Sequence, residues 1–194
     1  VGSSVSLRVD ANGAYDVDRA IDILKQLAAL SVDCVEQPIP RGAPEELAAV
    51  QAGSPIPVMA DESLVTVEDG RALVAARACE YFNLRLSKCG GIRRTLEIAG
   101  EAQRAGVRLQ VGCQVGEVAI LSAVGRHLAA YLDDVVYVEG SYGSMLLSED
   151  IGEESISFGS GGIGEVLRGP GLGVRVVDER LSSYAESVIE LGAG

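Results

Sequence analysis

Acidic side chains follow three short apolar runs at regular intervals near the start of the sequence. Asp10, Glu36 and Asp61 each come directly after such a run. Three carboxylates held together without a cation would repel one another, so their convergence implies a bound positive charge. Oxygen ligands favour a hard ion. Mg²⁺ fits best, because Mg²⁺ keeps positions open for substrate oxygens and water, and Mn²⁺ is the second choice. The alternative interpretation is that each carboxylate caps the helix after it.

A lysine stands at the corresponding place after the next apolar run. Lys88 is followed by Cys89, Gly90 and Gly91, and the two glycines allow close backbone approach. Near a metal and inside an apolar interior, a lysine is pushed towards its neutral form and can then act as a base. Without the carboxylates, a lysine that extends its ammonium into solvent at a strand end would be the better interpretation.

These residues lie at the ends of predicted strands in a repeating strand and helix pattern. Short β-branched runs alternate with segments of helical spacing, and the strand ends recur about every 26 residues. Six strands are predicted near residues 5–9, 32–35, 56–59, 81–86, 107–111 and 135–138. Five connecting helices are predicted near residues 17–28, 44–53, 66–74, 92–105 and 118–131.

A helix that returns over each strand makes the strands parallel, so this α/β pattern predicts a doubly wound sheet or a TIM-type (β/α) barrel. In a barrel the polar residues at the strand ends, up to Glu139, would meet at one mouth, where barrel enzymes do chemistry. The barrel is therefore preferred. Because a complete barrel has eight strands and about 250 residues, residues 1–143 are predicted to form about six of the eight strands. Residues 144–194 are Gly-rich and acidic and are predicted to form an extension that packs outside the barrel, with a short strand near 174–177.

Four short motifs, in this order and spacing, resemble the modified barrel domain of the enolase superfamily. They are most similar to its muconate lactonizing enzyme (muconate cycloisomerase) subgroup. The resemblance continues through residues 111–117, 139–143, 146–150 and 169–173, so it covers nearly the whole chain. The four motifs are Asp10-x-Asn12, Glu36-Gln37-Pro38, Asp61-Glu62-Ser63 and Lys88-Cys89-Gly90-Gly91.

The resemblance implies a magnesium-dependent isomerase of the mandelate racemase and muconate lactonizing enzyme family. Asp10, Glu36 and Asp61 would be the metal ligands, Lys88 the acid/base residue, and Asn12 would assist by hydrogen bonding. The shared step is removal of a proton alpha to a carboxylate, with the enediolate held by the metal. A muconate cycloisomerase, an N-acylamino-acid racemase or an epimerase fits, and an o-succinylbenzoate synthase-type dehydratase is an alternative. From another class, the chain could be a non-catalytic fragment that needs a partner for missing strands.

Residues near the last strands indicate which branch the chain resembles. The mandelate racemase branch uses a histidine at a strand end where this chain has Cys113, and the single histidine, His127, falls within a predicted helix. Epimerases of dipeptides hold the substrate ammonium with an Asp-x-Asp pair, where this chain has Glu139-Gly140-Ser141. Cys113, Glu139 and Ser141 are therefore expected to line the substrate site, with Glu139 either holding a cation or solvated.

The resemblance also predicts what this polypeptide lacks. The sequence opens on Val1, and the matching motifs imply that it starts at the third barrel strand. The first two strands, the N-terminal capping domain and a Lys-x-Lys motif with the opposite base would then lie upstream. We expect the chain alone to be inactive, and the complete protein to be a homo-oligomer that acts on a small carboxylate.

Composition excludes several other classes of function. Of 194 residues, 47% are hydrophobic, which is enough for a folded core. The net charge of −12 repels phosphate backbones, so nucleic acid is not an expected partner. No apolar run approaches the roughly 18 residues of a membrane helix. The four cysteines show no Cys-x-x-Cys pair and no secretory signal is visible, so a cytoplasmic location is expected.

Overall fold

The computed structural model describes residues 4–189, which form two compact units. The first comprises residues 4–112 and 128–139, and the second comprises residues 113–127 and 140–189. All six strands of the sheet lie in the first unit, so their ends can be compared directly with one another.

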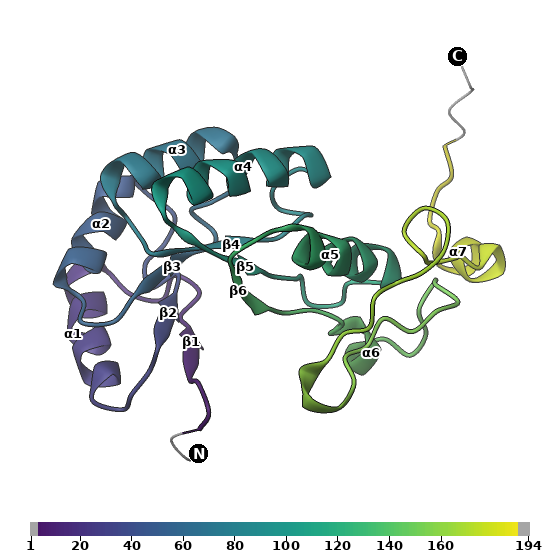
Figure 1. Ribbon diagram of the computed structural model, residues 1–194, viewed down its shortest axis with the longest axis horizontal. Helices are drawn as coiled ribbons and strands as arrows, with labels where there is room; N and C mark the ends of the chain where they lie inside the picture. Colours follow the sequence, from purple (N-terminus) through teal and green to yellow (C-terminus); the bar gives the residue numbers. More distant parts are fainter. Residues whose placement is uncertain (1–3, 190–194) are drawn as a thin grey trace. The chain divides into compact units, whose positions relative to one another are not determined.

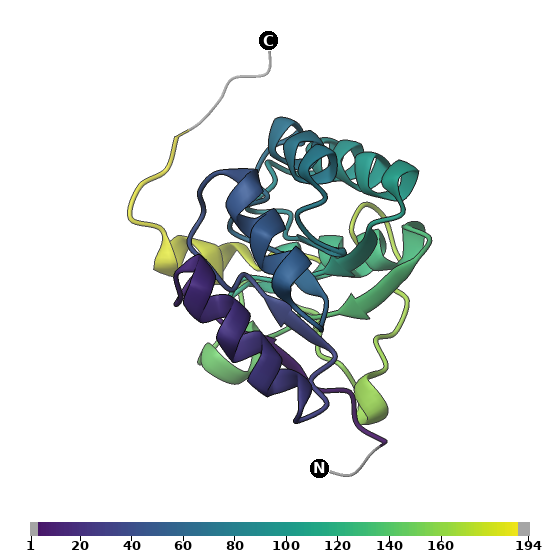
Figure 2. The ribbon, with the colours of Figure 1, turned by 90° about the vertical axis from the view of Figure 1, so that its left-hand side faces the viewer.

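The first unit contains a six-stranded parallel sheet in which the strands follow chain order. The strands are β1 (Arg8–Asp10), β2 (Cys34–Glu36), β3 (Val58–Ala60), β4 (Tyr81–Leu84), β5 (Arg108–Val111) and β6 (Val135–Val138). Four connecting helices are α1 (Val17–Ala28), α2 (Pro44–Gly53), α3 (Val67–Ala76) and α4 (Ile92–Ala105). They lie along one side of the sheet (Figure 1), and consecutive helices pack side by side (Figure 2). The predicted fold class, a partial (β/α) barrel, is confirmed.

Local sequence signals set where these helices begin and end. The Asp16 carboxylate accepts a hydrogen bond from the backbone N–H of Arg19 at 2.8 Å and caps α1. Thr66 and Asp69 form a reciprocal capping box at the start of α3. Gly106 ends α4 in the left-handed conformation, which glycine adopts without steric cost.

The two faces of the sheet carry different side chains because strand residues alternate in direction. One face packs against the helices and forms the main core, with Phe82, Leu84 and Leu109 fully buried. The opposite face, called here the inner face, carries an apolar cluster of Cys34, Met59 and Tyr81 together with polar residues. The polar residues near the carboxyl ends of the strands form the site described below.

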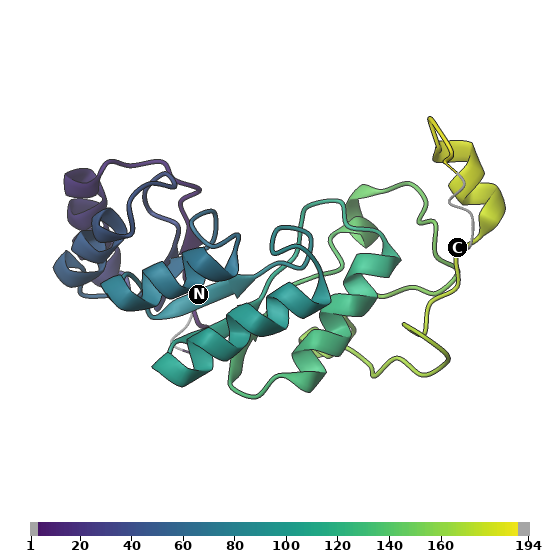
Figure 3. The same ribbon diagram turned by 90° about the horizontal axis from the view of Figure 1, so that it is seen from above.

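The second unit is mostly coil (Figure 3). The helix α5 (Ala119–Tyr131) belongs to this unit as far as His127. The unit also contains α6 (Gly143–Leu146), the short 3₁₀ helix η1 (Ser160–Gly162) and α7 (Asp178–Tyr184). The prediction of a strand near residues 174–177 is wrong, because this segment contributes an isolated antiparallel bridge between Val176 and Gly152 instead. The expected packing of the extension outside the barrel remains a prediction.

Several strand boundaries differ from those expected, and two examples bear on the site. The first strand begins at Arg8 rather than near Val5, and β4 ends at Leu84 rather than at Leu86. The chain turns after β4, where the N–H of Cys89 bonds to the carbonyl of Arg85 and that of Gly91 to Leu86. Within residues 4–189, the helices lack the length and apolar character needed to cross a membrane.

Candidate active site

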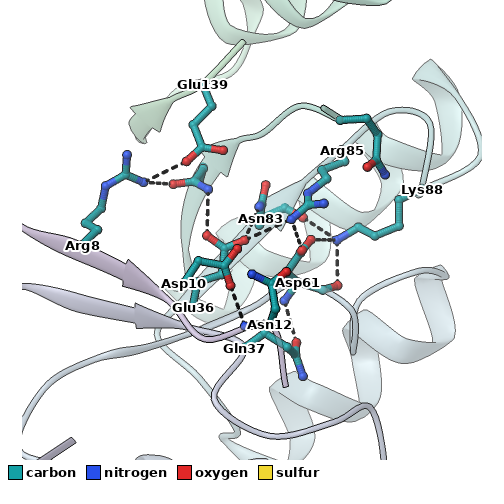
Figure 4. A network of polar contacts seen from close by, with 12 residues as sticks. Arg8, Asp10, Asn12, Glu36, Gln37, Asp61, Asn83, Arg85, Lys88 and Glu139 are labelled. Carbon is teal, nitrogen blue, oxygen red and sulfur yellow. Dashed lines mark hydrogen bonds and ion pairs between the residues drawn. The ribbon is translucent and has the colours of Figure 1, made fainter. Parts of the chain in front are cut away.

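Charged side chains from five strands gather on the inner face at the carboxyl end of the sheet (Figure 4). Asp10 and Glu36 are the last residues of β1 and β2, and Asp61, Arg85 and Glu139 directly follow β3, β4 and β6. The parallel order of the strands brings these ends to one edge. The structure therefore confirms the expected convergence of strand ends, and it adds an arginine to the group.

Glu36 is buried and accepts hydrogen bonds on both carboxylate oxygens. Its Oε1 accepts from Asn83 Nδ2 at 2.6 Å and lies 3.4 Å from Arg85 Nη2, and its Oε2 accepts from Gln110 Nε2 at 3.3 Å. Burial is the largest influence on its pKa and raises it to about 7; Asn83 lowers it, while Asp61 and Asp10 raise it further. Extra positive charge would therefore stabilise the ionised form of Glu36.

Asp61 is 1% exposed and is held by two cations. Its Oδ2 accepts from Arg85 Nη2, and its Oδ1 accepts from Lys88 Nζ at 2.5 Å. The Gln37 side chain fixes the backbone here, because its Oε1 accepts from the N–H groups of Asp61 and Ser63 at 2.9 and 3.1 Å. These hydrogen bonds join the loop after β2 to the loop after β3, and the Gln37 side chain that makes them is fully buried.

Lys88 lies in the turn after β4 rather than at the strand end itself. Its ammonium donates to Asp61 Oδ1, to the Asp61 carbonyl at 2.7 Å and to the Asn83 carbonyl at 3.0 Å. An ammonium has three N–H donors, so all three are used. Lys88 therefore supports Asp61 and the end of β4 in addition to any part in proton transfer.

The edge strands contribute more exposed groups. Asp10 Oδ1 accepts from the backbone N–H of Asn12 at 2.9 Å, and Asn12 has a left-handed backbone with φ of 46°. Arg8 donates to Gln110 and lies 3.5 Å from the Glu139 carboxylate. Burial raises the pKa of Glu139, although Arg8 and Arg85 lower it. Glu139 is thus paired with arginine rather than simply solvated.

The donor set fits a hard divalent cation. Five carboxyl groups, those of Asp10, Glu36, Asp61, Glu62 and Glu139, lie near three basic side chains, Arg8, Arg85 and Lys88, so the carboxyl groups outnumber the basic side chains by two. In the described part of the chain, Glu62 Oε2 and Asn83 Oδ1 are buried oxygens without a hydrogen-bond partner. Oxygen donors of this kind and an excess of carboxyl groups suit Mg²⁺.

The side chains themselves are not in a metal-binding arrangement. Across residues 4–189, no group of three or more His, Cys, Asp or Glu side chains is placed to hold a metal ion. Instead, Arg85 lies against both Glu36 and Asp61, and Lys88 lies against Asp61.

Two of the expected substrate-binding residues belong to the second unit. Cys113 is buried, and Ser141 is buried with its hydroxyl donating to the carbonyl of Ile156. His127 is half-buried in α5, with Nε2 3.0 Å from the carbonyl of Leu172. The roles expected for Cys113 and Ser141 remain predictions.

Sequence reasoning missed four polar residues that contact the carboxylates or their partners. A usable signal was present, because polar residues stand at alternate positions among apolar ones in Tyr81–Leu86 and Val107–Val111. That alternation marks side chains on the inner face of a sheet whose other face is core. The four residues are Arg8, Asn83, Arg85 and Gln110.

Comparison with known proteins gives consistent relatives. The family model described as enolase C-terminal domain-like matches residues 1–180. The chain is 34% identical to muconate cycloisomerase 1 of Pseudomonas putida over 185 residues, which cover 95% of this chain and 49% of that protein. It is 30% identical to an N-succinyl-L-Arg/Lys racemase of Bacillus cereus over 182 residues, 93% of this chain and 48% of that protein.

A solved structure agrees with these relatives. The dipeptide epimerase from Cytophaga hutchinsonii, complexed with Mg and the dipeptide D-Ala-L-Val, matches with a TM-score of 0.88 and 31% identity. The match covers 94% of this chain and 49% of the epimerase chain. This chain therefore spans about half the length of the relatives it matches.

Proposed function

Because the chain belongs to the enolase superfamily, through its enolase C-terminal domain-like family, we propose that it carries the metal ligands and one acid/base residue of a magnesium-dependent isomerase. The reaction is removal of a proton alpha to the carboxylate of a small substrate. The observation that carries the proposal is the convergence of Asp10, Glu36 and Asp61 on one inner face, with more carboxyl groups than basic side chains around them.

Asp10, Glu36 and Asp61 would hold the metal, and when bound Mg²⁺ would supply the charge that stabilises the enediolate anion. Gln37 fixes the backbone of Asp61, and Asn83 and Gln110 fix the Glu36 carboxylate. Asn12 would add a hydrogen bond near Asp10, and Glu139 would line the substrate site. Four buried cysteine thiols support a reducing, cytoplasmic location.

Lys88 is the proposed acid/base residue on one face of the substrate. Its ammonium lies within the carboxylate cluster, and the sequence contains one other lysine, Lys25, which is in α1. Because Lys88 also supports Asp61, its removal alone cannot separate proton transfer from a positioning role. A variant that keeps the cation is needed.

The reaction is tested in the natural protein that contains this chain. N-succinyl amino acids, dipeptides and muconolactone are incubated with it and Mg²⁺ in D₂O, and loss of the alpha-proton signal is followed by NMR. We expect exchange with at least one of these substrate classes, and Asp61→Asn should abolish both exchange and Mg²⁺ binding. A folded protein that binds Mg²⁺ and exchanges none of them would overturn the proposal.

The role of Lys88 is tested with Lys88→Arg and Lys88→Ala. Arginine keeps a cation beside Asp61 but stays protonated. If Lys88 transfers the proton, both variants lose exchange by about 10²-fold or more, and Lys88→Arg still binds Mg²⁺. If Lys88→Arg keeps the wild-type exchange rate, Lys88 only positions Asp61. Lys25→Arg is the matched control and should leave exchange unchanged.

A further inference from the structure

Arg85 places a guanidinium inside the carboxylate cluster. Its side chain is 17% exposed, and Nη2 donates to the Asp61 carboxylate and lies 3.4 Å from Glu36 Oε1 (Figure 4). The guanidinium thus bridges two of the three proposed metal ligands. Because arginine stays protonated in proteins, the bridge is a permanent internal cation.

The two bridged carboxylates have no oxygen without a donor. Glu36 accepts on Oε1 and Oε2, and Asp61 accepts on Oδ1 and Oδ2. Of the donors to these oxygens, Arg85 is the one that contacts both carboxylates. Its departure would therefore free space beside an oxygen of each ligand at the same time.

The bridge does not satisfy Arg85 completely. Within the described residues, Arg85 Nε is buried and has no hydrogen-bond acceptor. A buried donor without a partner costs free energy, so the side chain is held by its charge rather than by a full set of hydrogen bonds. A divalent cation carries twice the charge of a guanidinium and can replace it between the two carboxylates.

From these contacts we propose that Arg85 and the divalent cation compete for Glu36 and Asp61, so that metal binding displaces the guanidinium. This inference rests on the proposed metal site. Its consequence is that Arg85 holds the ligands in place in the metal-free protein and weakens metal binding at the same time.

The competition is tested in the natural protein that contains this chain. Its Mn²⁺ affinity is measured by EPR of free Mn²⁺, and its thermal stability is measured with and without Mn²⁺. Arg85→Gln should bind Mn²⁺ about tenfold or more tightly, since it removes charge-assisted hydrogen bonds that metal binding must otherwise break. It should also melt at a lower temperature without metal and regain the loss at saturating Mn²⁺. Arg108→Gln, which removes the guanidinium paired with Glu80 at 2.9 Å, should leave Mn²⁺ affinity unchanged.

The outcomes separate this inference from the metal site itself. Binding of Mn²⁺ by wild type but not by Asp61→Asn would support the metal site. If, in addition, Arg85→Gln binds Mn²⁺ no more tightly than wild type, the competition is refuted but the site is not. If wild type and Arg85→Gln both fail to bind Mn²⁺, the proposed site is refuted and the inference with it. If Arg85→Gln does not fold without metal, Arg85→Met, which keeps an unbranched side chain but no charge, replaces it. Tighter Mn²⁺ binding by Arg85→Met supports competition, and affinity equal to wild type refutes it.

Discussion

Asn83 and Gly112 show how a single backbone position controls the site. Asn83 is fully buried, and its amide is held against Glu36 at 2.6 Å. The backbone of Gly112 passes so close that a Cβ there would come within 2.8 Å of Asn83 Cγ. Glycine is therefore required at position 112 for Asn83 to reach Glu36.

Gly112→Ala should displace Asn83 and destabilise the protein by about 1–3 kcal/mol, the usual cost of overpacking a buried site. Urea denaturation measures the change. The double variant Asn83→Ala with Gly112→Ala should recover part of the loss, because the clash is removed. Strictly additive effects would contradict the proposed contact. Gly125→Ala is the control, since a Cβ at that position meets nothing within 4 Å.

At the scale of elements, the start of α3 anchors the loop that carries Asp61. Asp69 Oδ2 accepts from the backbone N–H groups of Val65 and Thr66 at 3.1 and 2.9 Å, and Thr66 Oγ1 accepts from the N–H of Asp69. Arg41 donates to both oxygens of Asp69 from the loop after β2. The loops after β2 and β3 are thus joined outside the site as well as through Gln37.

This anchor should depend on pH. Burial opposes the charge on Asp69, but the N–H groups of Thr66 and Val65 together with Arg41 lower its pKa below the ordinary 3.8. A carboxyl group with a lowered pKa in the folded protein stabilises the fold at pH values above its pKa in the unfolded chain. That contribution is lost as the pH falls through its pKa in the folded protein. Asp69→Ala should cost about 0.5–2 kcal/mol near neutral pH, and the difference from wild type should shrink below about pH 4.

Denaturation curves of wild type and Asp69→Ala across this pH range test the anchor. Asp16→Ala, which removes the N-cap of α1 and its one hydrogen bond to Arg19, is the control for loss of a cap at neutral pH. A difference that stays constant down to about pH 2 would show that the ionised Asp69 carboxylate contributes nothing specific.

These elements also show what can be predicted from the sequence. Caps such as Asp16 and the Thr66 and Asp69 pair are local signals, and parallel strands must end at one edge, so helix starts and the carboxylate positions follow from the chain. The hydrogen-bond partners of the carboxylates cannot be predicted in this way, because Arg85 and Gln110 lie 49 and 74 residues from Glu36 in the sequence. Only tertiary packing brings such residues together.

At the largest scale, side chains on the inner face connect the two outer strands of the sheet. Among residues 4–189, β1 pairs with β2 alone and β6 with β5 alone. Arg8 on β1 nevertheless lies 4.1 Å from the ring centre of Tyr137 on β6 and 3.5 Å from the Glu139 carboxylate. The sheet therefore curves enough for its first and last strands to interact across the inner face, as a partial barrel requires.

Arg8→Gln should loosen this curvature. It removes a cation–π contact and a partly exposed ion pair, together about 1 kcal/mol, from two strands that share no backbone hydrogen bonds. Hydrogen exchange should accelerate in both β1 and β6. Arg108→Gln removes a similar pair of contacts, to Tyr81 at 4.0 Å and Glu80 at 2.9 Å, but between the adjacent strands β4 and β5. That control should leave exchange in β1 and β6 unchanged, because the backbone ladder already joins its two strands. Equal acceleration of exchange in β1 and β6 by both variants would show that Arg8 is an ordinary surface contact, and that the curvature depends on the helices packed behind the sheet.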